Sequence, residues 1–483
     1  MRYIDALNLG NNLSNNIDCF ILIEPGFGYL IPALQGRFKE AKIISLHIDK
    51  TFYVENKFQT DKVSVWHNTH NLSLQDFLEN EIPELDASRT RIIEWRPSMK
   101  FYGEAYLKLL SQVVEFIKQA DASRRTTSVF GKKWVRNFFK NITYINKTIL
   151  YKQTEIPVIV TGSGPSLENE IPVIRQMQDF CLIIAASSSI LALENGGIKA
   201  DIIIATDGGS WALKHIYPFF RTANSMGENR LLRKHPPESA AESALAANLC
   251  AALPSQCCSL PFLILNDGSL WQNIILHELA LPSVMLQQRG TVTATAVDLA
   301  LALSAGNIYL AGMDLSIKGI RTHARPYEFD HLFYNSALRL SPFYSQSFIR
   351  SGLIRDGGSM DIYAAWFRNQ LAVWPKRIFY LTDTSGTLKD TPSIKQDVIK
   401  KTSGFFKTVH VNDNSVNNNG ADFCKRGVNA LLAAMKNSEY AASLRAELMP
   451  LLFPDTAASR KPASRVLPAE GELEKAITGA AYG

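Results

Sequence analysis

The amino-acid sequence predicts an α/β protein whose central domain is a Rossmann-like parallel sheet, preceded by an N-terminal α/β domain and followed by a C-terminal helical region. The prediction depends on short apolar runs that lead directly into small turn residues, with segments of helical periodicity between them. The stretch 156–168, I-P-V-I-V-T-G-S-G-P-S-L-E, shows this most clearly. Its β-branched run is typical of a strand buried on both faces of a parallel sheet. With 483 residues, the chain is expected to form two or three domains.

Residues 1–122 are expected to form the N-terminal α/β domain. An apolar strand at 19–23, a helix at 30–39 and a second strand at 43–48 make a βαβ unit that ends at Asp49. This order is similar to that of dinucleotide-binding units, but the glycine turn lacks a third glycine, so a structural or partner-binding domain is favoured. Further strands are predicted at 62–66 and 91–95, and a helix at 102–119.

Residues 123–155 read as a basic and aromatic connector. Its cations alternate with aromatic residues, which are Phe130, Trp134, Phe138 and Phe139. Such a pattern can bind single-stranded nucleic acid. An amphipathic helix that docks on the next domain is the favoured interpretation, because the aromatic residues recur at close to helical spacing.

Residues 156–393 are expected to form the central domain, in which polar side chains follow successive buried strands. Strands are predicted at 181–186, 200–205, 261–265, 308–311 and 377–381, and helices at 190–194, 294–305 and 361–370. Ser187 and Ser188 follow the first of these strands, Asp207 the second and Asp314 the fourth. Ligands of open parallel sheets gather beyond the carboxyl ends of the strands, so these side chains are expected at one edge.

The glycine turn at 162–166 is the most specific local feature. Gly162 and Gly164 allow the backbone to approach a ligand closely, and Ser166 can cap the helix that follows. The free N–H groups and the dipole of a helix amino end suit a phosphate. A tight turn without a ligand explains the same residues equally well, and no named nucleotide follows from the pattern.

Composition and charge exclude few classes of protein. The net charge of +6 fits an acidic small ligand and does not require nucleic acid. The six cysteines match no zinc motif, so reduced thiols are expected. Residues 1–20 carry no signal-peptide pattern and no stretch approaches the ~20 apolar residues of a membrane span, so the expected location is cytoplasmic. Residues 394–452 are expected to form the helical region, and 453–483 a flexible tail.

Five motifs of the central domain occur in an order that resembles the motility accessory factors, a family of bacterial flagellin glycosyltransferases. The motifs are G-S-G-P-S-L at 162–167, the acidic strand end at 201–207, G-T-V-T-A-T-A-V-D-L-A at 290–300, I-Y-L-A-G-M-D-L at 308–315 and T-H-A at 322–324. The pattern is also similar to bacterial CMP-sialic acid sialyltransferases. The resemblance covers roughly 155–385 and implies that 156–393 is a catalytic, sialyltransferase-like domain, and that 1–122 is an accessory domain.

The resemblance implies a protein O-glycosyltransferase. The reaction would transfer a nonulosonic acid, of the pseudaminic or legionaminic type, from a CMP-activated donor to Ser or Thr of flagellin. The implied partners are therefore flagellin and the CMP-nonulosonic acid, with no nucleic-acid or membrane partner. No cofactor is required, Mg²⁺ is optional, and no metal ligand is assigned, because a lone carboxylate such as Asp207 is a poor metal site.

The expected donor-binding residues are small, polar or basic. They are Gly162, Ser163, Gly164, Pro165, Ser166, Ser187, Ser188, Thr291, Thr293 and Arg325. His323 and Arg325 are expected to neutralise the phosphate or the sugar carboxylate as the glycosidic bond breaks. The sequence departs from the sialyltransferases at Ser163, where they have Asn, and it lacks their histidine base. Asp207, Asp314, His323 and Asp356 are therefore rival candidates for the catalytic base.

Two other classes of function remain open. The central domain also resembles archaeal pterin pyrophosphokinases, which transfer pyrophosphate from ATP with Mg²⁺. A non-enzymatic flagellin-binding chaperone that keeps the glycosyltransferase fold is the third hypothesis.

Overall fold

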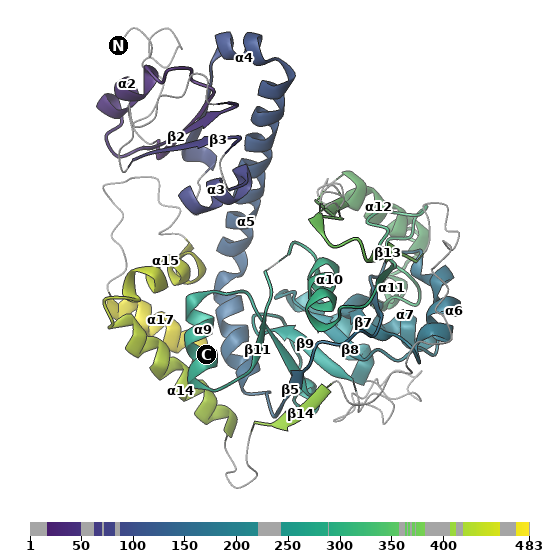
Figure 1. The fold of residues 1–483 in the computed structure, drawn as a ribbon. Helices are drawn as coiled ribbons and strands as arrows, with labels where there is room; N and C mark the ends of the chain where they lie inside the picture. Colours follow the sequence, from purple (N-terminus) through teal and green to yellow (C-terminus); the bar gives the residue numbers. More distant parts are fainter. Residues whose placement is uncertain are drawn as a thin grey trace. The chain divides into compact units, whose positions relative to one another are not determined.

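The structure is a computed structural model. It describes residues 17–49, 62–69, 72–82, 87–220, 243–287, 289–356, 363–364, 366–367, 370–371, 373–381, 406–411, 419–454 and 470–482. The chain divides into two compact units (Figure 1). The smaller unit contains residues 1–131 and 449–469, and the larger contains 132–448 and 470–483. Parallel sheets covered by helices confirm the predicted α/β class.

The smaller unit is built on a parallel sheet in the order β3-β2-β1-β4. Its strands are β1 (Cys19–Ile23), β2 (Lys42–His47), β3 (Val63–His67) and β4 (Thr90–Glu94), and its short helices are α2 (Leu30–Arg37), α3 (Leu74–Glu81) and α4 (Arg96–Tyr102). Side chains of β1 alternate between two cores. Ile21 packs with Phe77 of α3, whereas Leu22 packs with Leu34 of α2. The period of two along the strand thus buries both faces.

The larger unit contains a sheet that runs β13-β12-β6-β7-β8-β9-β10-β5-β14, with β11 paired to β10. The strands are β5 (Lys147–Tyr151), β6 (Val158–Thr161), β7 (Leu182–Ala186), β8 (Ile202–Ala205), β9 (Ala244–Asn248), β10 (Phe262–Asn266), β11 (Ser283–Met285), β12 (Ile308–Ala311), β13 (Ile378–Tyr380) and β14 (Phe406–His410). Every pairing is parallel except that of β14 with β5.

Helices cover both faces of this sheet. The helices of this unit are α6 (Leu167–Met177), α7 (Ile190–Asn195), α8 (Leu213–Ile216), α9 (Leu270–Glu278), α10 (Val292–Leu303), α11 (Glu328–Asn335), α12 (Phe343–Asp356), α14 (Asn419–Met435) and α17 (Glu470–Tyr482). Val158 and Val160 of β6 pack beneath α10, while Ile159 faces α6 and α7 (Figure 1). The apolar composition of α10 is explained by this burial.

The direction in which strands are added reverses between β6 and β12. The chain adds β7 and β8 on one side of β6, and later returns to place β12 on the other side. Parallel sheets bind ligands beyond the carboxyl ends of the strands at such a reversal. The turns after β6 and β12 are therefore the expected position of a functional site.

Helix α5 (Glu104–Ile142) crosses the boundary between the units, and α15 (Ala441–Leu452) crosses it again. The predicted connector is therefore no separate region, since its first part continues α5 and its last part contributes β5. Within the larger unit, Phe138 and Phe139 of α5 are fully buried, and the Phe138 ring lies 4.6 Å from that of Trp271. This confirms the docking helix that the aromatic spacing predicted.

Several elements differ from the sequence-based expectation. β9 and the helices α11 and α12 were not predicted, and β14 lies within the region expected to be helical. Residues 470–482 form α17 where a flexible tail was predicted, because Leu473 and Ile477 are buried and give the segment an apolar face. Residues 455–469 of that tail lie outside the described residues, as does much of the predicted helix at 361–370.

All six cysteine thiols are free. Burial raises the pKa of the Cys19 thiol to about 12, so this thiol stays protonated. Among the helices that the structure describes, none is both long and apolar enough to cross a membrane.

Truncation of Phe138 tests the docking of α5 on the larger unit. We expect Phe138→Ala to lower the free energy of unfolding by about 3–5 kcal/mol, since it leaves a cavity beside Trp271. Urea denaturation followed by circular dichroism measures the change. Val129→Ala on the same helix is the control, because that side chain is 72% exposed. Equal effects of the two substitutions would contradict the docking.

Candidate functional site

The turns after β6 and β12 are in direct backbone contact. The amide of Gly162 donates to Ala311 O at 2.8 Å, and that of Gly164 donates to Gly312 O at 2.8 Å. A Cβ at Gly162 would lie 2.5 Å from Gly312 O, and a Cβ at Gly312 would lie 2.5 Å from Gly162 O. Only glycine at both positions permits this approach. The glycines of the predicted motif therefore join the two strands at the reversal point.

Carboxylates of the protein itself bind the amino end of α6 and the turn after β12. Asp314 Oδ2 accepts hydrogen bonds from Ser166 N at 3.0 Å and Ser166 Oγ at 2.8 Å. Buried Glu170 accepts from Gly312 N at 2.6 Å. Ser166 occupies the N-cap position but its side chain makes no capping bond, so the predicted cap is wrong. A phosphate at this turn would meet Asp314, which favours an internal role for that residue.

Hydroxyl groups from two loops and a backbone amide from a third meet beside this contact. Ser188 Oγ donates to Ser163 Oγ at 2.9 Å, and Ser163 O accepts from Ala324 N at 2.8 Å. The backbone bond fixes the loop that carries His323 against the turn after β6. Ser187 is buried at the end of β7, and Pro165 is buried within the glycine turn. The structure thus brings together Ser163, Ser188 and the His323 loop.

His323 belongs to an aromatic cluster that extends to α8, α11 and α12. Its ring stacks on Tyr327 with a centroid separation of 4.1 Å and an interplanar angle of 5°. His215 lies 5.7 Å from Tyr327 and 5.1 Å from Phe329. The Arg350 guanidinium lies 5.5 Å from the centre of the Tyr327 ring. We call these five residues the histidine–arginine cluster.

Burial makes both histidines of this cluster neutral near pH 7. Desolvation, with the charges of Arg350 and His215, lowers the pKa of His323 to about 3. Desolvation also lowers the pKa of His215 to about 4, partly offset by the carboxylate of Asp207. His323 therefore does not supply the positive charge that the sequence-based hypothesis gave it. The cluster's positive charge comes from Arg350.

Asp207 is an exposed carboxylate at the end of β8. Its Oδ1 accepts from Gly209 N at 2.7 Å, and its carbonyl accepts from Ala252 N at 2.9 Å. Helix α5 packs against this loop through Trp134. A Cβ at Gly208 would lie 2.2 Å from the Trp134 ring. This loop thus holds the Asp207 carboxylate, whose negative charge acts on His215.

The cations around His323 are engaged with carboxylates. Arg321 pairs with Glu168 at 2.9 Å, and the same carboxylate accepts from Arg325 N at 2.9 Å. The Arg325 side chain lies 3.5 Å from Asp330. These contacts anchor the loop on α6, so the predicted phosphate contact of Arg325 would require exchange of its carboxylate partner.

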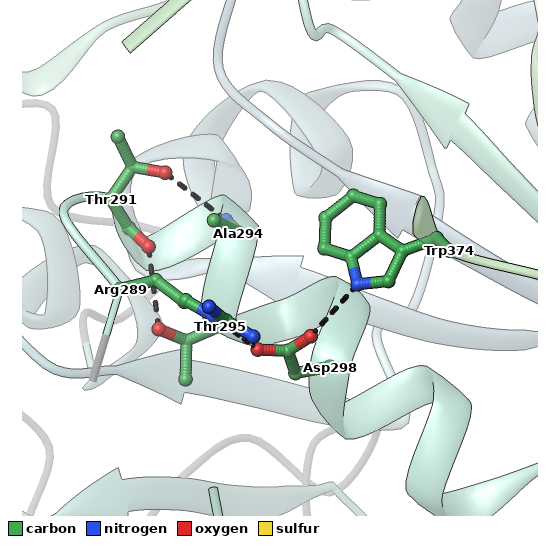
Figure 2. Close-up of polar contacts among 6 residues, drawn as sticks. All are labelled: Arg289, Thr291, Ala294, Thr295, Asp298 and Trp374. Atoms are coloured by element: carbon green, nitrogen blue, oxygen red, sulfur yellow. Dashed lines mark hydrogen bonds and ion pairs between the residues drawn. The ribbon is translucent and has the colours of Figure 1, made fainter. Parts of the chain in front are cut away.

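Thr291 caps the amino end of α10. Figure 2 shows its Oγ1 accepting from Ala294 N at 3.1 Å and its carbonyl accepting from the Thr295 hydroxyl at 3.3 Å. Asp298 accepts from Arg289 Nε at 2.6 Å and from Trp374 Nε1 at 3.2 Å, which ties the preceding loop to the helix (Figure 2). Thr291 thus has a helix-capping function where donor binding was predicted.

The remaining predicted residues have different placements. Thr293 is half-buried in the first turn of α10. The backbone of Asp356 ends α12, and its side chain lies outside the described residues. Among the described residues, no group of three or more His, Cys, Asp or Glu side chains is arranged to hold a metal ion.

Sequence reasoning missed His215, Tyr327 and Arg350. Tyr327 stands four residues after His323 and just beyond the T-H-A motif, so its stacking is a local signal that the motif did not include. His215 follows the predicted strand end at Asp207, but only tertiary packing brings it to His323. Arg350 lies on α12, which lacks a clear apolar stripe in the sequence.

Comparisons with known proteins find similarity over the middle of the chain. A family model described as 6-hydroxymethylpterin diphosphokinase MptE-like matches residues 132–319. The match confirms the resemblance to pterin pyrophosphokinases that the motifs indicated. It includes the contact between the turns after β6 and β12, and ends before Tyr327 and Arg350.

Two proteins of Treponema pallidum (strain Nichols), each named "Uncharacterized protein", are also similar to the chain. One is 28% identical over 304 residues, which are 61% of this chain and 60% of that protein. The other is 29% identical over 136 residues, which are 27% of this chain and 63% of that protein. The matches thus span about three fifths of the length of these relatives.

Among solved structures, the chain is similar to the MAf glycosyltransferase from Magnetospirillum magneticum AMB-1. The TM-score is 0.48 and the sequence identity 15%, over 96% of this chain and 73% of that one.

Substitution of Gly164 tests the contact between the two turns. A Cβ there would lie 2.0 Å from Asp314 Oδ2 and 2.7 Å from Gly312 O. We expect Gly164→Ala to lower the free energy of unfolding by about 1–3 kcal/mol in urea titrations. The control is Gly352→Ala, where a Cβ meets nothing within 4 Å. A neutral Gly164→Ala would show that the turns do not need to approach so closely.

Acid should destabilise the larger unit through the desolvated imidazole of His215. Because the folded-state pKa of His215 is about 4 against an ordinary 6.5, its contribution to stability is present above pH 6.5 and is lost as the pH falls towards 4. Between about pH 7 and about pH 5, protonation of His215 should cost the parent about 2 kcal/mol of its free energy of unfolding. We expect this loss to be absent in His215→Phe. Urea titrations at both pH values measure this loss. An unchanged pH dependence in the variant would refute the assignment.

Proposed function

We propose that the chain is a protein glycosyltransferase that transfers a nonulosonic acid from a CMP-activated donor to Ser or Thr hydroxyls of flagellin. The observation that carries the proposal is the histidine–arginine cluster beside the turns after β6 and β12. It places two neutral imidazoles, a guanidinium and several hydroxyls at the edge where parallel sheets bind ligands. The ordered motifs of the central sequence support the same class of reaction.

The charge of the cluster suits an acidic sugar donor. Such a donor carries one phosphate and a sugar carboxylate, and Arg350 can pair with either of them. Departure of CMP leaves negative charge on the phosphate, so a cation nearby stabilises the transition state more than the ground state. Trp211 is 66% exposed and lies 5.8 Å from Phe329, which offers an aromatic surface for the sugar or the base.

His215 is the proposed base for the acceptor hydroxyl, and Asp207 is its proposed partner. The neutral imidazole of His215 can accept the hydroxyl proton, and the neighbouring Asp207 carboxylate stabilises the imidazolium that forms. His323 has the lower pKa and stacks on Tyr327, so we assign it to orientation of the ring surface. In this proposal Asp314 positions the turn after β12 and takes no proton.

A second candidate function is favoured by the family model that matches residues 132–319. A pterin diphosphokinase would transfer pyrophosphate from ATP to a hydroxymethyl pterin and release AMP, with Mg²⁺ bound to the nucleotide. Mg²⁺-dependent formation of AMP in the presence of the pterin would support this function, and AMP formation without dependence on the pterin would not.

Replacement of Arg350 tests the proposed transferase. We expect Arg350→Met to reduce transfer to flagellin by at least about tenfold, since the donor loses its cation. The assay incubates purified protein with CMP-nonulosonic acid and flagellin, and measures the mass of flagellin peptides. Arg339→Met is the matched control, because it removes the same charge from an exposed position.

The outcomes separate the functions clearly. Transfer by the parent protein and by Arg339→Met, with loss in Arg350→Met, supports the proposal. Equal transfer by Arg350→Met and Arg339→Met would contradict a role of Arg350 in donor binding. Flagellin binding without donor consumption by the parent protein would favour the chaperone hypothesis.

A further inference from the structure

Six exposed apolar side chains lie on α11, α12 and the turn that joins these helices. They occur within residues 334–349, and they are one third of the large apolar side chains that are exposed in the described part of the chain. Single exposed apolar residues are common on proteins, whereas a group of large ones marks contact with another molecule. The group, here called the α11–α12 surface, consists of Tyr334, Leu338, Leu340, Tyr344, Phe348 and Ile349.

Hydrogen bonds hold the turn between the two helices in place. Leu338 and Ser341 exchange backbone hydrogen bonds of 3.0 Å in both directions. Arg339 and Leu340 therefore form the tip of the turn, and Leu340 is 97% exposed. Gln346 Nε2 of α12 donates to Ser341 O at 2.9 Å, which fixes the tip against the first turn of that helix. The apolar tip is thus ordered before any partner binds, which lowers the entropic cost of association.

Helix α12 has two different faces. Gln346 and Arg350 are four residues apart and share one face, and the Arg350 guanidinium lies 4.8 Å from the centre of the Phe333 ring on α11. Tyr344 and Phe348, also four residues apart, share the opposite face, where Phe348 is 65% exposed. Apolar residues on both faces explain why the sequence of α12 shows no clear apolar stripe.

Residues 332–355 have the composition of a protein interface. They include five aromatic residues and no Lys, Asp or Glu. Protein interfaces are enriched in aromatic residues and depleted in these charged ones. A lipid surface is usually recognised by a cluster of about four to eight Lys and Arg residues. This stretch contains three arginines, one of which faces α11, so a protein partner is favoured.

The α11–α12 surface is continuous with the candidate site through α12. Arg350 of the histidine–arginine cluster directly follows Ile349, which is 61% exposed. A helix with its side chains is about 10 Å across. A standard protein interface covers about 800 Å² on each partner and so extends over roughly 30 Å. A protein that presents a hydroxyl group to the cluster would therefore also reach the outer face of α12.

We propose that the α11–α12 surface docks the protein acceptor of the transferase through an apolar segment of that acceptor. This inference rests on the proposed function, which supplies the acceptor. The contact is apolar, so it does not require the charge of Arg339 at the tip. A second copy of this chain and a lipid surface are the alternative occupants, and the experiment distinguishes them.

Binding of flagellin to the full-length protein, without a sugar donor, tests the proposal. The double variant Leu340→Ser/Phe348→Ser removes two apolar side chains from the α11–α12 surface. The matched control is Met285→Ser/Val373→Ser, which removes two exposed apolar side chains elsewhere in the same unit. Biolayer interferometry should show a dissociation constant at least about tenfold higher for the first variant and an unchanged one for the control.

Two results would overturn the proposal directly. One is an unchanged affinity for flagellin in Leu340→Ser/Phe348→Ser, and the other is a parent protein that does not bind flagellin. Circular dichroism equal to that of the parent checks the folding of each variant. Leu338→Ser repeats the test with a single change at another exposed position, and it should also weaken binding.

Failure of the proposed function would be seen separately. A parent protein that binds flagellin and transfers no sugar would contradict the transferase, while the affinities of the variants would still test the docking surface. If the parent transfers sugar, Leu340→Ser/Phe348→Ser should raise the KM for flagellin at least about tenfold and leave donor hydrolysis without flagellin unchanged.

The alternative occupants have their own measurements. Light scattering would assign the surface to a second copy if the parent is a dimer, the double variant is a monomer and both bind flagellin equally. Sedimentation with phosphatidylglycerol vesicles would assign it to lipid if only the parent binds the vesicles and both bind flagellin equally. Either result would overturn the proposal.

Discussion

The close backbone contact between Gly162 and Gly312 is the constraint on which the larger unit depends. It joins the turns after β6 and β12, the two strands between which the direction of the sheet reverses. Because the backbones touch, the polar groups around them need hydrogen-bond partners within the protein. Asp314 accepts from Ser166 N, and Glu170 accepts from Gly312 N. The loop that carries His323 is then fixed by the carbonyl of Ser163. The candidate site is thus built outward from two glycines.

This arrangement separates the structural carboxylates from the groups available for chemistry. Asp314 accepts a hydrogen bond from the amino end of α6, so the partial positive charge of this helix is already neutralised. Positive charge for an anionic substrate comes instead from Arg350 on α12. The aromatic rings around Arg350 and the histidines lower the local polarity and keep both imidazoles neutral. Neutral imidazoles beside a guanidinium suit the activation of a hydroxyl next to an acidic donor.

Strands that are apolar and β-branched could be predicted from the sequence alone, as β6, β8 and β12 show. β9 could not, because its residues A-L-A-A-N have weak strand propensity and are stabilised by burial between β8 and β10. The positions of Ser163, Ser188 and Asp207 beyond strand ends followed from the topology. His215 and Arg350 did not, since only tertiary packing places them near His323. Local patterns likewise predicted a cap for Ser166 and could not reveal the competing bond to Asp314.

In the proposed reaction, the edge beside β6 and β12 binds the CMP part of an activated sugar. The most direct test is the thermal unfolding of the purified protein with CMP and with ATP, each with and without Mg²⁺. A ligand at about 100 times its dissociation constant stabilises a fold by about 2.7 kcal/mol, a shift of several degrees. The proposal predicts stabilisation by CMP in the absence of metal. Stabilisation by ATP with Mg²⁺ alone would contradict it and favour the diphosphokinase.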